Sequence, residues 1–180
     1  MSTLTLPATG TWTLDPAHSS VGFSARHLVA ARVRGSFKAF SGQIVVADTP
    51  EASSVTVAID AASVDTGAED RDNHLRSADF LDVENHPTLD FVSTAVRTVA
   101  DGYEVDGTLT IRETTQPVTL SMQYSGVVAD PWGNEKAIFS ATTKINREDF
   151  GLVWNAALEG GGWLVGKHVE IEIEVQAALS

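Results

Sequence analysis

The chain has 180 residues, 43% of them hydrophobic, and no cysteine, which excludes a disulfide framework, a thiol nucleophile and a thiolate metal site. Its formal net charge of -12 disfavours binding to nucleic acid, because such a surface repels phosphate backbones. No apolar run approaches the ~20 residues that cross a bilayer, and residues 1–10 do not resemble a secretory signal peptide. We therefore expect one domain over residues 1–180 that is soluble and cytoplasmic, with no stable membrane insertion.

Alternation of apolar and polar residues with a period of two predicts strands in the first third of the chain. We expect these strands at residues 11–15, 20–27, 35–48 and 55–60, with an irregular stretch over 28–34. Inside the third strand the apolar row slips by one residue between Phe37 and Phe40. We interpret this slip as a β-bulge, which would bend the strand and help a barrel to close.

The period then changes and returns. Thr66-Gly67-Ala68-Glu69 has the pattern of a capping box and predicts a short helix that runs to about Ser77. Strand patterns resume at residue 89 and are clearest at 169–175, where valine and isoleucine interleave with glutamate. About eight strands with hairpin spacing, and one short helix after the fourth strand, predict an all-β sandwich or up-and-down barrel. A barrel of that size is just wide enough for a small ligand.

Few residues have the spacing of a catalytic or metal site. The histidines are scattered and the known catalytic motifs are absent, so we expect no metal, no cofactor and no catalytic residue. His27 continues the apolar row of its strand and is either a structural histidine or a hydrogen-bond donor to a polar headgroup at the edge of the interior. Arg147 precedes a turn, where it either pairs with a carboxylate to fix the loop or binds a phosphate.

Four motifs in order resemble the signatures of the YceI-like family. They are Trp12-Thr13-Leu14-Asp15 with His18-Ser19, Phe23, His27 and Gly35-Ser36-Phe37; Leu75 to Asp82 with Pro87 and Phe91; Gly107 to Arg112; and Asn146 to Gly151, followed by Val169 to Val175. The likeness covers residues 10–178. It departs at Glu113, where the family usually has glycine, and at His86, where an aromatic residue commonly precedes the proline.

The resemblance implies an extended, antiparallel, lipocalin-like barrel with a long hydrophobic tunnel. It implies non-catalytic binding, transport or storage of a long amphiphilic lipid: a polyisoprenoid such as an isoprenoid quinone or prenyl pyrophosphate, or a fatty acid. Many members are dimers, so a homodimer is an expected partner state. Large aromatic side chains either line such a tunnel or form ordinary core, and the candidates are Phe23, Phe37, Phe40, Phe91, Phe139, Phe150 and Trp154. The headgroup candidates are His27 and Arg147.

Two rival functions remain open. An enzyme acting on such a lipid would use His27 or His18 as its acid or base, whereas a packed interaction domain would have no room for a chain. Burial gains ~0.8 kcal/mol per methylene, so hydrocarbon area alone does not choose between an acyl and a polyprenyl ligand.

Overall fold

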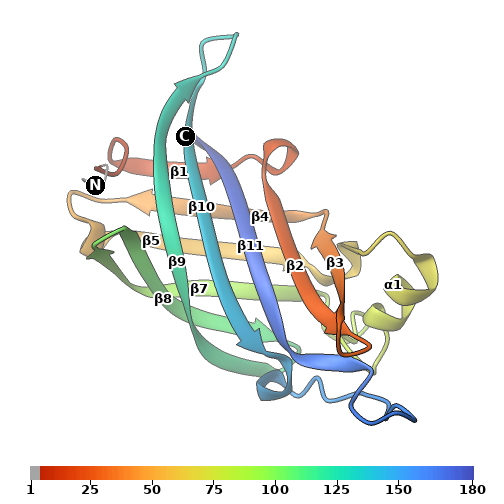
Figure 1. The fold of residues 1–180 in the computed structure, drawn as a ribbon. Helices are drawn as coiled ribbons and strands as arrows, with labels where there is room; N and C mark the ends of the chain where they lie inside the picture. Colours follow the sequence, from red (N-terminus) through yellow and green to blue (C-terminus); the bar gives the residue numbers. More distant parts are fainter. Residues whose placement is uncertain (1–4) are drawn as a thin grey trace.

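The computed structural model describes residues 5–180, and in that range the chain is almost entirely β-structure (Figure 1). The strands are β1 (Gly10–Leu14), β2 (Ser20–His27), β3 (Ala31–Phe37), β4 (Phe40–Val46), β5 (Ser54–Asp60), β6 (Val64–Asp65), β7 (Thr88–Val99), β8 (Gly102–Ile111), β9 (Thr114–Ala129), β10 (Glu135–Asn146) and β11 (Val165–Leu179). The helix α1 spans Glu69–Arg76, and the short 3-10 helices are η1 (Pro16–His18), η2 (Pro50–Ala52), η3 (Ala61–Ser63) and η4 (Arg147–Phe150). None of the helices in this range is both long and apolar enough to cross a bilayer.

Eight strands close into an antiparallel barrel. Their order is β1-β4-β5-β7-β8-β9-β10-β11, and β11 returns to β1 through the pairs Trp12–Leu179, Thr13–Ala178 and Leu14–Ala177. Closure pairs the edge strands of the sheet with each other, so that ladder is continuous around the barrel. The all-β antiparallel barrel with one helix is therefore confirmed.

The N-terminal part of the chain is interrupted between β1 and β2, between β3 and β4 and between β5 and β6. A second sheet segment leaves the barrel at these breaks. Beyond its pairing with β1, the strand β11 pairs with β2, which pairs with β3, which pairs with β6. At the break, the Lys38 backbone N–H donates to the Ser63 carbonyl at 3.1 Å, and the Asp60 N–H donates to the Ala39 carbonyl at 2.9 Å. We call β2, β3 and β6 the β2–β3–β6 extension.

The strand predicted over residues 35–48 is two strands. The chain breaks at Lys38 and Ala39, which are both exposed, and the halves have different partners, β2 for β3 and β1 with β5 for β4. The β-bulge interpretation is wrong: the slip between Phe37 and Phe40 is a strand break, with Phe40 buried in the core and Phe37 partly buried against it. Residues 31–34, expected to be irregular, belong to β3.

The predicted helix is present, but it begins differently. Ala68 occupies the N-cap position and makes no side-chain cap. Thr66 instead donates from its N–H and Oγ1 to the Asp72 Oδ1, at 2.8 and 2.6 Å. The capping box is therefore not formed. Because the predicted third strand is divided and the two-residue β6 precedes α1, the helix follows the sixth strand rather than the fourth.

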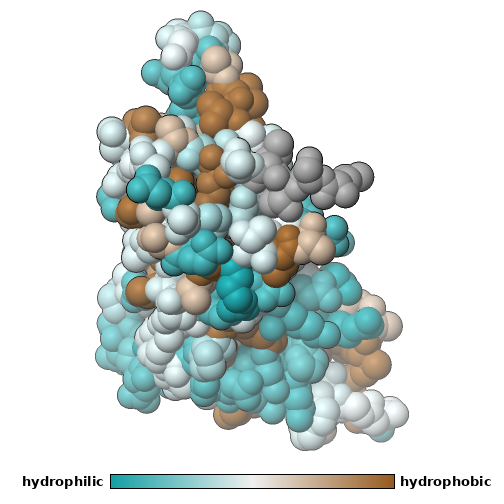
Figure 2. All heavy atoms as spheres, turned by 90° about the vertical axis from the view of Figure 1, so that its left-hand side faces the viewer, coloured by the Kyte–Doolittle hydropathy of each residue, from teal (hydrophilic) through white to brown (hydrophobic). Residues whose placement is uncertain are grey.

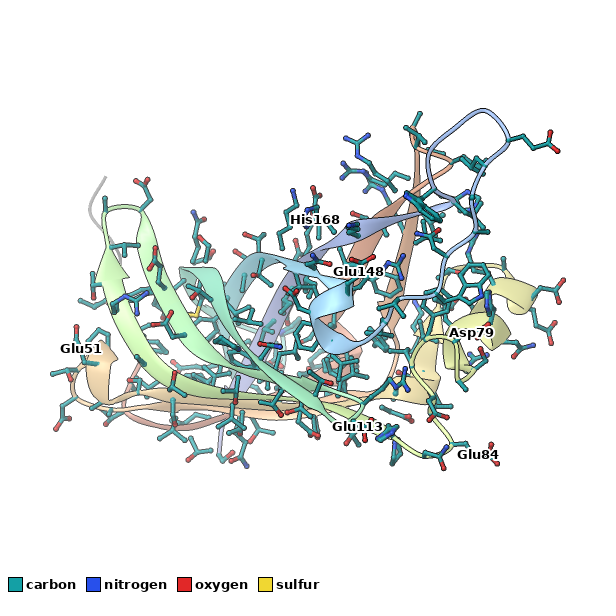
Figure 3. All side chains as sticks on the ribbon, turned by 90° about the horizontal axis from the view of Figure 1, so that it is seen from below. Glu51, Asp79, Glu84, Glu113, Glu148 and His168 are labelled. Carbon is teal, nitrogen blue, oxygen red and sulfur yellow. The ribbon has the colours of Figure 1, made fainter. Side chains whose placement is uncertain are left out.

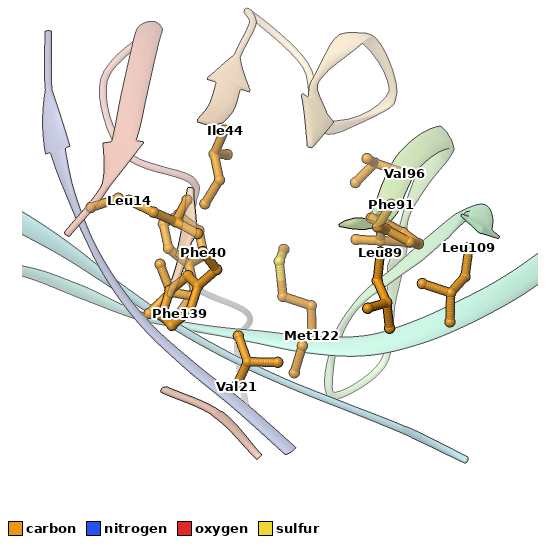
Figure 4. Close-up of a cluster of buried hydrophobic side chains, with 14 of the residues drawn as sticks. Leu14, Val21, Phe40, Ile44, Leu89, Phe91, Val96, Leu109, Met122 and Phe139 are labelled. Carbon is orange, nitrogen blue, oxygen red and sulfur yellow. The ribbon is translucent and has the colours of Figure 1, made fainter. Parts of the chain in front are cut away.

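Buried side chains project inward from opposite sides of the barrel (Figure 4). In that view Leu89, Phe91 and Leu109 face Phe139 across the interior, and Met122 extends between the two groups. The ring of Phe91 lies over Gly107, where an added Cβ would overlap the ring and come within 2.6 Å of the Val92 carbonyl oxygen. A glycine at this position is therefore required for Phe91 to point into the barrel.

Gly107→Ala should displace Phe91 and lower the free energy of unfolding by roughly 1–3 kcal/mol, as overpacking usually does. Gly126→Ala is a useful comparison, because its added Cβ meets nothing within 4 Å and only its positive φ of 108° opposes the change. Urea denaturation of both variants measures the difference. An unchanged midpoint for Gly107→Ala would show that Phe91 does not depend on the glycine.

Asp15 joins the end of β1 to β10. Its Oδ2 lies 2.8 Å from His18 Nδ1 and 3.1 Å from Lys136 Nζ. The hydrogen bond with His18, and then that with Lys136, hold the pKa of the Asp15 carboxyl below its ordinary 3.8. A carboxyl with a lowered native pKa stabilises the fold above its unfolded pKa, and this contribution is lost as the pH falls through the native value.

Asp15→Asn should lower the free energy of unfolding by about 1 kcal/mol near neutral pH. The deficit should shrink toward zero as the pH is brought below 3.8, the ordinary value for the carboxyl. Denaturation curves over a pH series, with Asp101→Asn in the exposed β7–β8 turn as the control, measure this. A deficit that persists undiminished at low pH would contradict the assignment.

Candidate functional site

An apolar cavity of about 230 Å³ lies inside the barrel. Every barrel strand contributes at least one lining residue, and β2 and β3 contribute others. The polar side chains in the lining are Ser140, Thr143 and Arg147. The volume exceeds that of the ~150 Å³ apolar cavity that stays dry and admits benzene, so this interior has room for hydrocarbon.

The strand alternation supplies most of the lining. The inward rows are Val55, Val57 and Ile59 on β5, Val118, Leu120 and Met122 on β9, and Val169, Ile171, Ile173 and Val175 on β11. Charged residues alternate with the last row and lie outside. Figure 3 shows His168 on the outer side of β11, and Glu51, Asp79, Glu84 and Glu113 around the periphery pointing away from the barrel. On these strands, one face is therefore exposed to solvent and the other faces the cavity.

The structure brings four of the seven aromatic candidates to the cavity: Phe23, Phe37, Phe91 and Phe139. The other three lie elsewhere. Phe40 and Phe150 are buried in the surrounding core. Trp154 packs edge-on against His74, with ring centroids 4.5 Å apart, and against Phe80 at 5.5 Å. Contact of any of these side chains with a lipid stays a prediction.

Arg147 is 4% exposed and holds the segment that follows it. Its Nη1 donates to the carbonyls of Leu152 at 2.6 Å and Trp154 at 2.9 Å. Its Nε donates to the Gly166 carbonyl at 2.9 Å, and its Nη2 makes a long contact of 3.4 Å with Val165. Arg147 therefore fixes residues 152–166 through backbone carbonyls rather than through a carboxylate.

The guanidinium of Arg147 also borders the cavity, beside Phe80, whose ring centroid lies 5.9 Å from its Cζ. Burial lowers the pKa of Arg147, and the charge of Glu148 opposes that shift. Within residues 5–180 it makes no ion pair with a carboxylate. Because Nη2 has two N–H groups and one distant acceptor, a positive charge and a hydrogen-bond donor remain at this end of the cavity.

The two histidines considered in the sequence lie outside the cavity lining. His27 is the last residue of β2 and pairs with Ala31 and Val165. It therefore flanks the same Val165 that Arg147 contacts. His18 is exposed and bonds to Asp15. In the described part of the chain, no group of three or more His, Asp or Glu side chains is placed to hold a metal ion.

The aliphatic lining, and Phe80, Leu81 and Leu152, were missed as site residues. The alternating rows are the signal for the aliphatic residues, whereas the size of an aromatic side chain does not by itself identify a lining residue. Phe80 and Leu81 follow α1 and reach the barrel only because the chain folds back there, as shown by the bond from the Leu81 N–H to the Leu75 carbonyl at 2.9 Å.

Arg147→Met should leave buried carbonyls unpaired and lower the free energy of unfolding by roughly 2–4 kcal/mol. The free energy of unfolding of Arg147→Lys should lie between those of the parent chain and Arg147→Met. A single ammonium group cannot donate to several carbonyls with the planar fork geometry of a guanidinium. Denaturation and limited proteolysis of residues 153–164 test this, with the exposed Arg34→Met as the control. Equal protease resistance in the methionine variant and the parent chain would contradict the role of Arg147.

The chain is similar to known proteins over most of its length. A family model described as a YceI-like domain matches residues 12–177. A "UPF0312 protein" of Ectopseudomonas mendocina (strain ymp) is 41% identical over 137 residues, which cover 75% of this chain and 72% of that protein.

Solved structures share the fold. BcnA of Burkholderia cenocepacia superposes with a TM-score of 0.79 at 25% identity, over 92% of this chain and 99% of that one. A domain of Saccharophagus degradans, described as a polyisoprenoid binding domain implicated in plant cell wall breakdown, superposes with a TM-score of 0.64 at 14% identity, over 94% of this chain and 98% of that one.

Proposed function

Since the chain belongs to the YceI-like family, we propose that its barrel cavity binds a long-chain amphiphilic lipid and carries or stores it without chemical change. The observation that carries the proposal is the apolar cavity, lined from every barrel strand. A packed interaction domain would fill this space with side chains. Hydrocarbon taken into the cavity leaves water and gains ~0.8 kcal/mol per methylene.

The ligand we propose is a polyisoprenoid, such as an isoprenoid quinone or a prenyl pyrophosphate, with a fatty acid as the alternative. The fold shared with the Saccharophagus degradans polyisoprenoid binding domain supports this choice. Arg147 supports a polar or anionic headgroup, because its charge has no carboxylate partner in the described chain and its Nη2 retains a donor. We place the headgroup at the Arg147 end and the chain among the β5, β9 and β11 rows.

The lining supports binding rather than turnover. Its polar side chains are Ser140, Thr143 and Arg147, and none of these is a general acid or base near neutral pH. His18 and His27, the residues that a lipid-modifying enzyme would use, lie outside the lining.

Ala141→Trp tests the proposal by filling the cavity. Ala141 is on β10, is buried and lines the cavity, so an indole there would occupy the space proposed for the lipid. Thr142→Trp is the matched control, because the next residue of the same strand is exposed. Native mass spectrometry of gently purified protein, with extraction and identification of the bound species, measures occupancy.

We expect the parent chain and Thr142→Trp to carry a lipid and Ala141→Trp to lose it. Equal occupancy in both tryptophan variants would place the lipid elsewhere. A parent chain that is empty, and that takes up neither quinones, prenyl phosphates nor fatty acids, would overturn the proposal.

A further inference from the structure

Four large apolar side chains are exposed together at one end of the molecule. Leu28 and Val29, in the β2–β3 turn, are 51% and 59% exposed. Val153 and Trp163, in the segment between η4 and β11, are 63% and 58% exposed. The Leu28 N–H donates to the Leu164 carbonyl at 2.9 Å, and Val29, Val153 and Trp163 line one surface groove. We call these four residues the apolar tip.

The backbone of the turn does not account for its apolar residues. Leu28 and Val29 have φ of 53° and 66°, in the left-handed region. That region favours glycine and asparagine, and a β-branched residue there is an outlier. A turn that served only to reverse the chain would be more stable with those residues. Conformations of this kind occur often at functional sites.

Cationic side chains accompany the apolar tip: Arg26 and Lys167 line the same groove, together with the carboxylate of Glu148. Residues 24–34 and 151–168 contain Arg26, Arg32, Arg34 and Lys167 and one carboxylate, Glu159. Two of the cations have acidic partners outside these segments, at 2.9 Å for Arg32–Glu170 and 3.5 Å for Lys167–Glu148. In the described chain, Arg26 and Arg34 form neither an ion pair nor a side-chain hydrogen bond. With the two acidic partners counted, four cations accompany three carboxylates, a local net charge of +1 in a chain whose net charge is -12.

We propose that the apolar tip docks onto the surface of an anionic lipid bilayer. Tryptophan and aliphatic side chains partition into the headgroup region, where an indole is well accommodated. The unpaired Arg26 and Arg34 would contact anionic headgroups. The acidic remainder of the protein is repelled by the same surface, so the molecule would dock in one orientation. This surface is separate from the cavity and goes beyond the proposed function.

Another exposed tryptophan distinguishes docking through the apolar tip from nonspecific hydrophobic adsorption. Trp132 is 82% exposed in the β9–β10 turn, which projects from the opposite end of the barrel (Figure 1). Figure 2 shows apolar residues near the base of that projection on an otherwise largely hydrophilic face. Its neighbours Asp130 and Glu135 are acidic, so an anionic bilayer would repel this end. Trp132 therefore serves as a matched control.

A second copy of this chain is a less suitable occupant. A two-fold contact through the apolar tip would bring the same patch of both copies together. The unpaired Arg26 and Arg34 of each copy would then approach those of the other. An anionic bilayer surface would instead attract Arg26 and Arg34, because its charge is opposite to theirs.

Flotation of the full chain with lipid vesicles tests the proposal. One set of vesicles is phosphatidylcholine alone and the other contains equal parts of phosphatidylcholine and phosphatidylglycerol. We expect binding to the second set only, and loss of binding at high salt. Trp163→Glu should weaken binding by about tenfold or more, whereas Trp132→Glu, with the same change in charge, should leave it unchanged.

A second variant keeps the test independent of the folding of Trp163→Glu. Arg26→Gln with Arg34→Gln changes only exposed side chains and should weaken binding roughly fivefold for each arginine. Binding that is unaffected by both variants, that is equal on neutral vesicles, or that is lost in Trp132→Glu instead, would overturn the proposal. A parent chain that dimerises in size-exclusion chromatography, with dimers that Trp163→Glu dissociates, would assign the tip to a second copy and also overturn it.

Lipid occupancy of the same samples separates this proposal from the previous one. Vesicle binding by a chain whose cavity is empty and takes up no lipid would support docking and overturn only the proposed function. An occupied cavity without vesicle binding would overturn only docking.

Discussion

The architecture depends on the way one long strand is shared. Along one edge, β11 pairs with β10 from Asn146–His168 to Lys136–Ala178. Along its other edge it pairs first with β2 and then, over its last residues, with β1. If one continuous strand paired along the whole of this second edge, β11 would be part of an ordinary closed barrel wall. Because β1 and β2 are separated by the turn at Pro16, the wall closes at one end and opens into the β2–β3–β6 extension at the other. The cavity, α1 and the apolar tip are all positioned by that division.

The sequence predicted the parts of the fold that depend on period. Alternation along a strand assigns each side chain to a face, so the rows at Val55–Ile59 and Val169–Val175 indicated both the strands and their inward residues. The break at Lys38 was not predictable in the same way. A one-residue slip is produced by a bulge and by a strand break alike, and only the long-range partners of β3 and β4 distinguish them.

The site was less predictable than the fold, because it depends on where irregular segments cross the barrel. Phe23 and Phe40 are both phenylalanines within strands, yet only Phe23 lines the cavity. The partners of Arg147 are backbone carbonyls of residues 152–166, and no side-chain pattern encodes a carbonyl acceptor. Phe80 reaches the cavity through the fold of the segment after α1. In each case the decisive contact is distant in sequence or involves the backbone, so local pattern does not report it.

The carbonyl partners of Arg147 have a consequence for the chemical conditions in which this end of the protein keeps its shape. A guanidinium remains charged across the biological pH range, and a peptide carbonyl does not titrate there. The contact is also buried, so dissolved ions screen it weakly. A contact that includes a carboxylate, such as that of Asp15 with Lys136, would instead be lost as the carboxyl becomes protonated in acid. The hydrogen bonds from Arg147 that hold the segment carrying Val153 and Trp163 therefore do not change with pH or ionic strength. The same geometry would persist in an acidic or a salt-rich compartment.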